Sequence, residues 1–287
     1  MTDQNTKQKI GTKEKITWCP GCPNFMILES VKQAISELIE EKQAKQTDFA
    51  ISTDIGCNSK IYDYLNLSGI YGLHGRALAT AIGMKLGNPH LKVIAFQGDG
   101  GAYAEGISHL IHSFRYNADM TLILHDNQSF SLTTGQPTPT SQQGYISKSE
   151  PLGEPDKPIN PVKLALASNA TFIARANAMD IQGTKEIIKK AIQHKGFSFV
   201  EIAQKCLIFN LDMNSLDKLM YKIPDNQDIK KANELADEWD YNTSKTGHDK
   251  IPIGIIYQTK EKTLEEKWPQ LKNLVDKRVT WQEKQKQ

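Results

Sequence analysis

Apolar and polar residues form two alternating patterns along this chain. Apolar stripes with a three-to-four residue period, or packed small residues, predict helices over 24–41, 75–86, 102–114, 162–168 and 185–194. Short apolar runs predict buried strands over 49–52, 92–97, 120–125, 171–176 and 197–203. Because strands and helices alternate, we expect an α/β fold of three layers, a mostly parallel sheet with helices on both faces and right-handed crossovers.

The same pattern divides the chain into three parts. Residues 1–15 are polar and predict a flexible tail, whereas 16–210 carry the alternating elements and predict a single domain. Residues 211–287 are highly charged and predict an extension that packs on this domain or on a partner. The stretch 133–161 contains six prolines and predicts a long loop, which in a compact domain is usually functional or bound to a partner.

Composition excludes some classes of protein. The 35 basic and 33 acidic residues nearly cancel to a net charge of +2, which argues against a dedicated nucleic-acid binder. No run approaches the ~18 apolar residues of a membrane span, and the polar N-terminus does not resemble a signal peptide. We therefore expect a cytoplasmic protein, in which thiols stay reduced and a Cys-x-x-Cys spacing favours a metal or redox site.

Gly98-Asp99-Gly100 and Asn127 are the strongest chemical signal. Each follows a predicted buried strand, and the carboxyl ends of neighbouring parallel strands meet at the edge where α/β sheets bind ligands. The two side chains and a backbone carbonyl just beyond Asn127 are oxygen ligands of the kind that Mg²⁺ prefers. The glycines allow close approach of a phosphate. The alternative is a turn whose aspartate caps a helix, but the second strand and Asn127 favour a Mg²⁺-held diphosphate, and hence a thiamine-diphosphate enzyme.

The chain has four cysteines, Cys19, Cys22, Cys57 and Cys206. Four thiolates suit a [4Fe–4S] cluster or a structural zinc ion, and buried cysteines without a metal are the third possibility. Spacing alone leaves all three open, although zinc sites usually use two local pairs of ligands. The neighbouring diphosphate site favours the [4Fe–4S] cluster, because a cluster could accept electrons from a thiamine enzyme.

Two histidines receive separate interpretations. His74, with Gly75 and Arg76, opens a predicted helix and could reach a diphosphate or a substrate oxygen; the alternative is a histidine satisfied at a helix start. His125 lies within the strand that leads to Asn127 and is expected to be a core or wall residue.

Six motifs together resemble those of the β subunits of 2-oxoacid:ferredoxin oxidoreductases. They are WCPGCPNF at 18–25, IGCNSK at 55–60, LHGRA at 73–77, FQGDGGAYAEG at 96–106, DNQSFSLTTGQPTPT at 126–140 and QKC at 204–206. The chain departs from the family at Pro23, Gly101 and Thr134, and these departures leave the choice of 2-oxoacid open.

The resemblance implies a reaction and its partners. A 2-oxoacid such as pyruvate or 2-oxoglutarate would be decarboxylated to acyl-coenzyme A and CO₂, with electrons passing from thiamine diphosphate through the cluster to ferredoxin. The active enzyme would contain an α subunit, in a heterodimer or a dimer of heterodimers, and that partner would supply the activating glutamate. The alternative is a non-oxidative thiamine-dependent decarboxylase subunit with a four-cysteine zinc site.

The resemblance also implies roles for individual residues. The cluster ligands would be the four cysteines, and the Mg²⁺ ligands would be Asp99, Asn127 and the backbone carbonyl of Ser129. His74 is the only candidate catalytic residue in this chain. The contacts to the diphosphate and thiazolium would come from Gly56, Cys57, Asn58, His74, Gly75, Arg76, Gly98, Asp99, Gly100, Gly101, Asn127, Ser129, Leu132 and Thr133.

Overall fold

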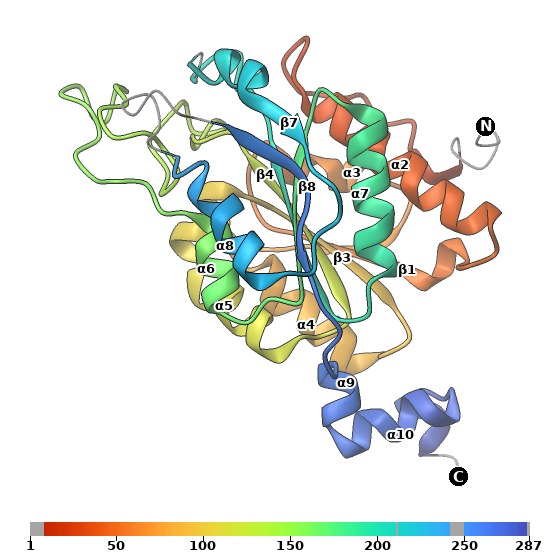
Figure 1. The fold of residues 1–287 in the computed structure, drawn as a ribbon. Helices are drawn as coiled ribbons and strands as arrows, with labels where there is room; N and C mark the ends of the chain where they lie inside the picture. Colours follow the sequence, from red (N-terminus) through yellow and green to blue (C-terminus); the bar gives the residue numbers. More distant parts are fainter. Residues whose placement is uncertain (1–8, 211, 242–249, 286–287) are drawn as a thin grey trace.

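A single sheet of eight strands runs through the centre of the computed structural model, which describes residues 9–210, 212–241 and 250–285 (Figure 1). The strands are β1 (Phe49–Thr53), β2 (Ser68–Tyr71), β3 (Lys92–Gly98), β4 (Met120–Asp126), β5 (Phe172–Asn177), β6 (Phe197–Ala203), β7 (Met220–Lys222) and β8 (Ile251–Gln258). Their order across the sheet is β2-β1-β3-β4-β6-β5-β8-β7.

The connections between strands are helical. The α-helices are α2 (Asn24–Glu40), α3 (Ile61–Tyr64), α4 (Ala77–Gly87), α5 (Ile107–Tyr116), α6 (Pro161–Ala167), α7 (Ile181–Gln193), α8 (Ile229–Asp237), α9 (Leu264–Lys267), α10 (Pro269–Lys277) and α11 (Trp281–Lys284). The 3₁₀-helical segments are η1 (Gln46–Asp48), η2 (Asn58–Lys60) and η4 (Asp212–Leu219), and η3 (Gly101–Glu105) is a π-helical turn. Among the described helices, none has the length and apolar character needed to cross a bilayer.

Most neighbouring strands are parallel, as the alternating pattern predicts. The pairs β2–β1, β1–β3, β3–β4, β4–β6 and β6–β5 are parallel, whereas β8 runs antiparallel to β5 and carries the parallel β7 at the edge. Helices cover both faces: α2, α3 and α7 lie on one side and α4, α5, α6 and α8 on the other (Figure 1). The predicted three-layer α/β fold is confirmed.

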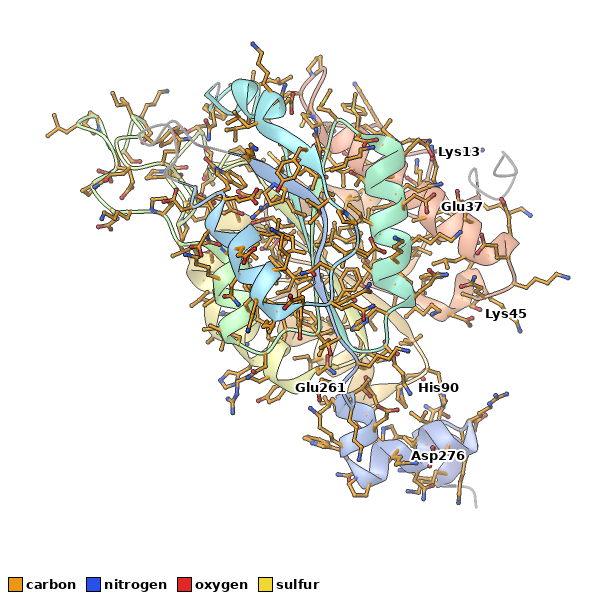
Figure 2. All side chains as sticks on the ribbon, viewed as in Figure 1. Lys13, Glu37, Lys45, His90, Glu261 and Asp276 are labelled. Carbon is orange, nitrogen blue, oxygen red and sulfur yellow. The ribbon has the colours of Figure 1, made fainter. Side chains whose placement is uncertain are left out.

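Side-chain alternation along the central strands explains the two cores. In β3, Ile94 and Phe96 belong to the core beneath α2 and α7, whereas Val93 and Ala95 belong to the core beneath α4 and α5. Because both faces of these strands are buried, their sequence reads as a continuous apolar run instead of an alternating one. Ion pairs reinforce the first layer, where Glu37 of α2 meets Lys185 of α7 at 2.7 Å (Figure 2).

The N- and C-terminal parts contribute to the same body. Ile10 is fully buried and Gly11 forms a bridge with Leu65, while residues 1–8 of the predicted tail lie outside the described residues. The C-terminal part supplies β7, β8 and α8, and its α9 and α10 extend beyond the sheet (Figure 1). The domain limits drawn from the sequence stay predictions.

Several local elements differ from the sequence prediction, and strands β7 and β8 of the C-terminal part were not predicted. The helix expected over 102–114 begins only at Ile107, because η3 forms a π-helical turn between Gly101 and the helix. Strand β2 was not predicted, because it is only four residues long, is mostly exposed and contains no apolar run. Such an edge strand is recognised by its backbone pairing with β1 instead of by its side chains.

A fully buried ion pair links the centre of the sheet to the C-terminal part. Arg175 of β5 donates from Nε to Glu201 Oε2 of β6 at 2.8 Å and from Nη2 to the Tyr241 hydroxyl at 3.2 Å. Its guanidinium also lies 4.7 Å from the Trp239 ring centroid. Tyr103 of η3 donates to the other oxygen of Glu201 at 3.2 Å, so the network reaches the turn that follows Gly100.

Removing one charge from this network should be costly. We expect Glu201→Gln to lower the free energy of unfolding by about 3–5 kcal/mol, because it leaves a buried guanidinium uncompensated. Lys163→Met breaks the exposed pair with Asp237 and should cost no more than about 1 kcal/mol. Urea unfolding of the purified chain measures both, and equal losses would show that the buried network is not a main source of stability.

Candidate functional site

The register of the parallel strands brings the ends of β1, β3, β4 and β6 to one edge. Gly98 pairs with His125, Asp126 pairs with Ala203, and Thr53 pairs with Phe96. The segments that leave these strands therefore start side by side. They contain most of the residues that the sequence singled out.

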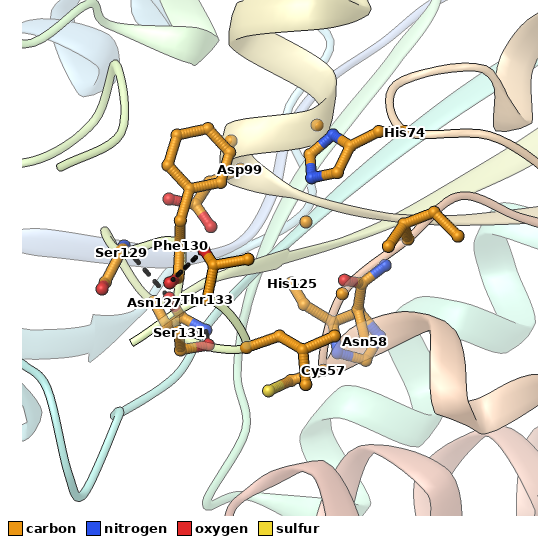
Figure 3. A pocket seen from close by; sticks show the side chains of 16 residues that line it. Cys57, Asn58, His74, Asp99, His125, Asn127, Ser129, Phe130, Ser131 and Thr133 are labelled. Carbon is orange, nitrogen blue, oxygen red and sulfur yellow. Dashed lines mark hydrogen bonds between the residues drawn. The ribbon is translucent and has the colours of Figure 1, made fainter. Parts of the chain in front are cut away.

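A pocket opens at this edge (Figure 3). It is lined by Ile55, Gly56, Cys57, Asn58, His74, Gly98, Asp99, Gly100, Gly101, His125, Asn127, Ser129, Phe130, Ser131, Leu132 and Thr133. Every residue predicted to contact the diphosphate or thiazolium lines it, except Gly75 and Arg76. Ile55, Phe130 and Ser131 line it without having been predicted.

Asp99 is buried at the centre of this edge. Its Oδ2 accepts hydrogen bonds from the hydroxyls of Thr138 at 2.6 Å and Thr140 at 3.1 Å. Burial raises the pKa of Asp99 to about 6, and these hydrogen bonds oppose the rise. The backbone of Asn127 also acts against the rise in the pKa of Asp99, as expected for a residue that lies close to this carboxyl.

Asn127 is held in one orientation by the loop that follows it. Its Oδ1 accepts from the Ser129 N–H at 3.1 Å, and its Nδ2 donates to Ser131 Oγ at 3.2 Å (Figure 3). The Ser129 carbonyl accepts from the Ser131 N–H at 2.8 Å. A carboxylate, an amide oxygen and a main-chain carbonyl are hard oxygen donors, so the residues present fit Mg²⁺.

The glycines after β3 are required by close contacts. A Cβ atom on Gly100 would lie 2.1 Å from the Phe130 ring, and one on Gly101 would lie 2.0 Å from Asp54 Oδ2. Neither contact is possible for a real side chain without movement of its neighbours. The glycines therefore let the backbone pack closely against Phe130 and Asp54, beside the pocket.

Asp54 is a buried carboxylate that the sequence prediction missed. It accepts from Asn58 Nδ2 at 2.8 Å, from Ser59 Oγ at 2.9 Å and from the Gly75 N–H at 3.4 Å. Burial raises its pKa to about 6. Asp54 thereby ties the segment around Cys57 to the segment around His74. The signal that could have found it is the one used for Asp99, an acidic residue directly after a buried strand.

The predicted group His74-Gly75-Arg76 does not reach the pocket as a unit. The His74 ring lines the pocket, with Nδ1 3.1 Å from Glu105 Oε2 and its centroid 5.7 Å from that of Phe130. Arg76 is exposed and donates from Nη1 to the Glu105 carbonyl at 2.7 Å. Gly75 is buried against η3, where a Cβ would lie 2.7 Å from the Gly101 carbonyl. Only His74 is therefore available to a molecule in the pocket.

His125 forms part of the pocket wall, as expected from its place in β4. Its Nδ1 shares a hydrogen bond with Asn24 Oδ1 at 2.8 Å. Burial lowers the pKa of His125 to about 3, so the ring is neutral at physiological pH. Its Nε2 has no hydrogen-bond partner among the described residues.

All four cysteines line a second cavity beside the pocket. Its lining residues are Thr17, Trp18, Cys19, Cys22, Asn24, Cys57, Lys60, Asn127, Ser131, Leu132, Thr134, Gln204, Lys205, Cys206, Leu207, Ile208 and Phe209. Burial raises the pKa of Cys22 to about 11, and the other three cysteines add to the rise. In the described part of the chain, however, no three His, Cys, Asp or Glu side chains are close enough together to hold a metal ion.

The pocket and the cysteine cavity share part of their walls. Cys57, Asn127, Ser131 and Leu132 line both. Cys57 is also anchored through its carbonyl, which accepts from Trp18 Nε1 at 2.6 Å. The four thiols thus face one space next to the oxygen-rich pocket, which is the donor chemistry of an iron–sulfur or zinc site.

A side chain on Gly100 should disturb the sheet edge. We expect Gly100→Ala to destabilise the protein by about 1–3 kcal/mol, because the new methyl group overlaps the Phe130 ring. The matched control is Gly83→Ala in α4, where a Cβ meets nothing within 4 Å and helix propensity should improve stability by about 0.5–1 kcal/mol. Thermal unfolding compares the two, and equal effects would contradict the tight packing at Gly100.

Comparisons with known proteins point to one family. The family described as "Thiamine pyrophosphate enzyme, C-terminal TPP binding domain" matches residues 54–202, which contain every residue that lines the pocket. The 2-oxoacid:ferredoxin oxidoreductase subunit beta of Saccharolobus solfataricus is 41% identical over 253 residues, covering 84% of this chain and 81% of that protein. The 2-oxoglutarate oxidoreductase subunit KorB of Mycobacterium tuberculosis is 41% identical over 210 residues, or 73% of this chain and 55% of that protein.

A solved structure has the same fold over nearly the whole chain. It is the 2-oxoglutarate:ferredoxin oxidoreductase of Magnetococcus marinus with 2-oxoglutarate, coenzyme A and succinyl-CoA bound. The TM-score is 0.84 at 33% identity, with 96% of this chain and 92% of that chain covered. Since both sequence and fold match over most of the length, the chain belongs to the β subunits of the 2-oxoacid:ferredoxin oxidoreductases.

Proposed function

We propose that this chain is the thiamine-diphosphate-binding subunit of an enzyme that oxidatively decarboxylates a 2-oxoacid, with coenzyme A as the acyl acceptor. The observation that carries the proposal is the shared edge itself, where an oxygen-rich pocket adjoins a cavity lined by four cysteines. A thiamine enzyme that passes electrons to an iron–sulfur cluster held by its own cysteines needs both kinds of site. The names of the relatives and the ligands in the Magnetococcus structure support the same reaction.

Asp99, Asn127 and the Ser129 carbonyl are the residues that would hold Mg²⁺ and, through it, the diphosphate. The two threonine hydroxyls fix the Asp99 carboxylate before any ligand binds, which reduces the cost of ordering it. When bound, thiamine diphosphate supplies the nucleophilic carbon and the electron sink for decarboxylation. The chain supplies position and surroundings.

The other pocket residues form a largely uncharged wall. His125 is neutral and fixed by Asn24, so it can share a hydrogen bond without adding charge. Phe130 packs against His74, and its ring occupies the space where a side chain on Gly100 would lie. Apart from the cysteine Cys57, His74 is the one titratable side chain among the described pocket residues that is partly exposed, so it is proposed to bind the substrate or move a proton.

The four cysteines are proposed to hold a [4Fe–4S] cluster that passes electrons to ferredoxin. Four thiols around one cavity match the ligand set of such a cluster. The backbone N–H of Phe209 donates to Cys206 Sγ at 3.4 Å, a hydrogen bond of the kind that tunes cluster potentials. Cys57 lines both cavities, so electrons leaving the pocket would have a short path to the cluster.

An α subunit is proposed to complete the site. Among the described residues that line the pocket there is no glutamate, so the group that activates the thiamine ring is assigned to a partner. Large apolar side chains are exposed around this edge and could be covered by that subunit: Ile70, Tyr71, Leu73, Leu132, Leu207 and Ile208.

The activity of the assembled enzyme tests the proposal. The chain should be co-purified with its α subunit without oxygen and assayed with 2-oxoglutarate, pyruvate or a branched-chain oxoacid, coenzyme A and a ferredoxin. Reduction of ferredoxin that depends on both coenzyme A and one 2-oxoacid is expected. Release of CO₂ with no acceptor reduced, from a colourless protein that contains zinc, would instead establish the non-oxidative alternative.

Replacing the central carboxylate should abolish Mg²⁺-dependent binding of the cofactor. We expect Asp99→Asn to weaken thiamine diphosphate binding more than about 100-fold in the presence of Mg²⁺. Loss of a residue that only hydrogen-bonds to a metal ligand typically lowers metal affinity by about 10- to 100-fold, and loss of the ligand itself should lower it at least as much. Asp276→Asn, on the exposed surface of α10, should change nothing (Figure 2). Isothermal titration measures both, and unchanged affinity in Asp99→Asn would contradict the assigned ligand.

Removing one thiol should abolish the cluster without abolishing the binding of thiamine diphosphate. We expect Cys206→Ser to lose the visible absorbance of the cluster and ferredoxin reduction while thiamine diphosphate still binds, since Cys206 lines only the cysteine cavity. The absorbance spectrum and the binding titration provide the two readouts. Full electron transfer by Cys206→Ser would exclude this cysteine as a ligand.

A further inference from the structure

One ring nitrogen of His125 is left unpaired in the wall of the pocket. The residue is buried, with 1% of its surface exposed, and it lines the pocket (Figure 3). Its Nδ1 is engaged by Asn24 Oδ1 at 2.8 Å, whereas Nε2 has no hydrogen-bond partner among the described residues. Because a buried polar atom without a partner is costly and uncommon, this nitrogen points to a partner that the pocket receives.

The contact with Asn24 determines which nitrogen of His125 carries the proton. A side-chain amide oxygen only accepts hydrogen bonds, so Nδ1 must donate to it. A neutral imidazole has a single N–H group, and Nε2 is consequently left as an acceptor with a free lone pair. The hydrogen bond on one side of the ring thereby fixes what the other side offers to the pocket.

The surroundings of Asn24 support this orientation of its amide. Asn24 is the first residue of α2, is fully buried and also lines the cysteine cavity. Within the described part of the chain, its Nδ2 has no hydrogen-bond partner. Since thiolate and sulfide sulfur atoms accept hydrogen bonds, the amide nitrogen suits the cysteine cavity and the amide oxygen suits His125.

Neighbouring residues hold the His125 ring in place. His125 lies near the end of β4, where it pairs with Gly98 of β3 and with Ile202 of β6. Its ring meets the Phe96 ring edge-on, with centroids 6.2 Å apart and planes inclined by 71°. A rotation of the ring that paired Nε2 elsewhere would break the hydrogen bond to Asn24. The acceptor is therefore presented at a fixed place.

We propose, on the basis of the function proposed above, that His125 binds the ligand of the pocket through Nε2, which accepts a hydrogen bond from an N–H or O–H group that enters with Mg²⁺ and thiamine diphosphate. Asn24 is the positioning residue that keeps this nitrogen without a proton. It acts on the ligand only through His125.

The chemistry of the ligand limits what the donor can be. The oxygens of an ionised diphosphate are acceptors, so they cannot satisfy Nε2 and would be repelled by its lone pair. Two groups that accompany the diphosphate can donate: the amino group on the pyrimidine ring of thiamine, and a water molecule held by Mg²⁺, which usually keeps several. They differ in whether the organic part of the cofactor is required.

Nitrogen NMR spectra of the histidine-labelled chain, assembled with its unlabelled α subunit, report the proton position. The variant His125→Gln identifies the His125 signals among those of the seven histidines. We expect a proton on Nδ1 and none on Nε2. In Asn24→Leu the proton should move to Nε2, because Nδ1–H would have no acceptor. A proton on Nε2 of the unchanged protein, alone or together with one on Nδ1, would overturn the proposal.

Addition of ligand tests the hydrogen bond itself. Mg²⁺ with thiamine diphosphate should shift the Nε2 signal in the direction of hydrogen-bond acceptance. The same shift with Mg²⁺ and inorganic diphosphate would identify the donor as a metal-held water, and a shift with thiamine diphosphate alone would identify it as the amino group. These spectra of the unchanged protein decide the case even if Asn24→Leu does not fold.

The affinity for thiamine diphosphate provides a second readout. By isothermal titration Asn24→Leu should bind it about 10-fold more weakly, because a proton on Nε2 would face another donor. The matched control is Ser36→Ala, which removes a buried hydroxyl further along α2 and should change neither the spectrum nor the affinity.

The two proposals fail in different ways. Thiamine diphosphate that binds without any change at Nε2, or equally tightly to Asn24→Leu with its proton on Nε2, would overturn the role of His125 and leave the proposed function intact. If the unchanged complex binds no thiamine diphosphate, the proposed function itself fails, and the role of His125 with it.

Discussion

The parallel register of β1, β3, β4 and β6 is the constraint on which the site depends. Because Gly98 pairs with His125 and Asp126 with Ala203, the residues that follow these strands emerge at the same level. Parallel strands cannot turn directly into one another, so each is followed by a crossover that starts from this edge. Asp54, Asp99 and Asn127 are brought together by topology, although they are far apart along the chain.

Burial of charged groups at this edge then determines the loops. Asp54 and Asp99 lose water on folding, and an unpaired buried carboxylate is costly, so each must find donors nearby. Asp99 takes them from Thr138 and Thr140 of the long proline-rich loop, and Asp54 takes them from Asn58, Ser59 and the Gly75 amide. The carboxylates thus fix the segments that form the pocket before any cofactor arrives.

The pattern of apolar and polar residues predicted the layers of the fold and the centre of the candidate site, because both depend on short stretches of sequence. Buried strands, the glycines around Asp99 and the position of Asn127 needed no knowledge of distant contacts. Phe130 was missed because its role depends on a partner in another segment, the Gly100 backbone. Asp54 carries the same local signal as Asp99, an acidic residue directly after a buried strand, and was overlooked. Arg76 was expected at the pocket from its place in the motif with His74, but its guanidinium donates to the Glu105 carbonyl. Strand β2 was not predicted from the sequence because it is short and exposed at an edge of the sheet.

The central claim is that one sheet edge carries both a thiamine diphosphate site and an iron–sulfur site. The most direct measurement is the content of thiamine diphosphate, iron and acid-labile sulfide in the anaerobically purified complex, compared with a variant in which Cys19 and Cys22 are replaced by serine. We predict bound thiamine diphosphate in both proteins, and iron and sulfide in equal amounts only in the unchanged one. Zinc in place of iron, or iron that survives the double substitution, would contradict the account.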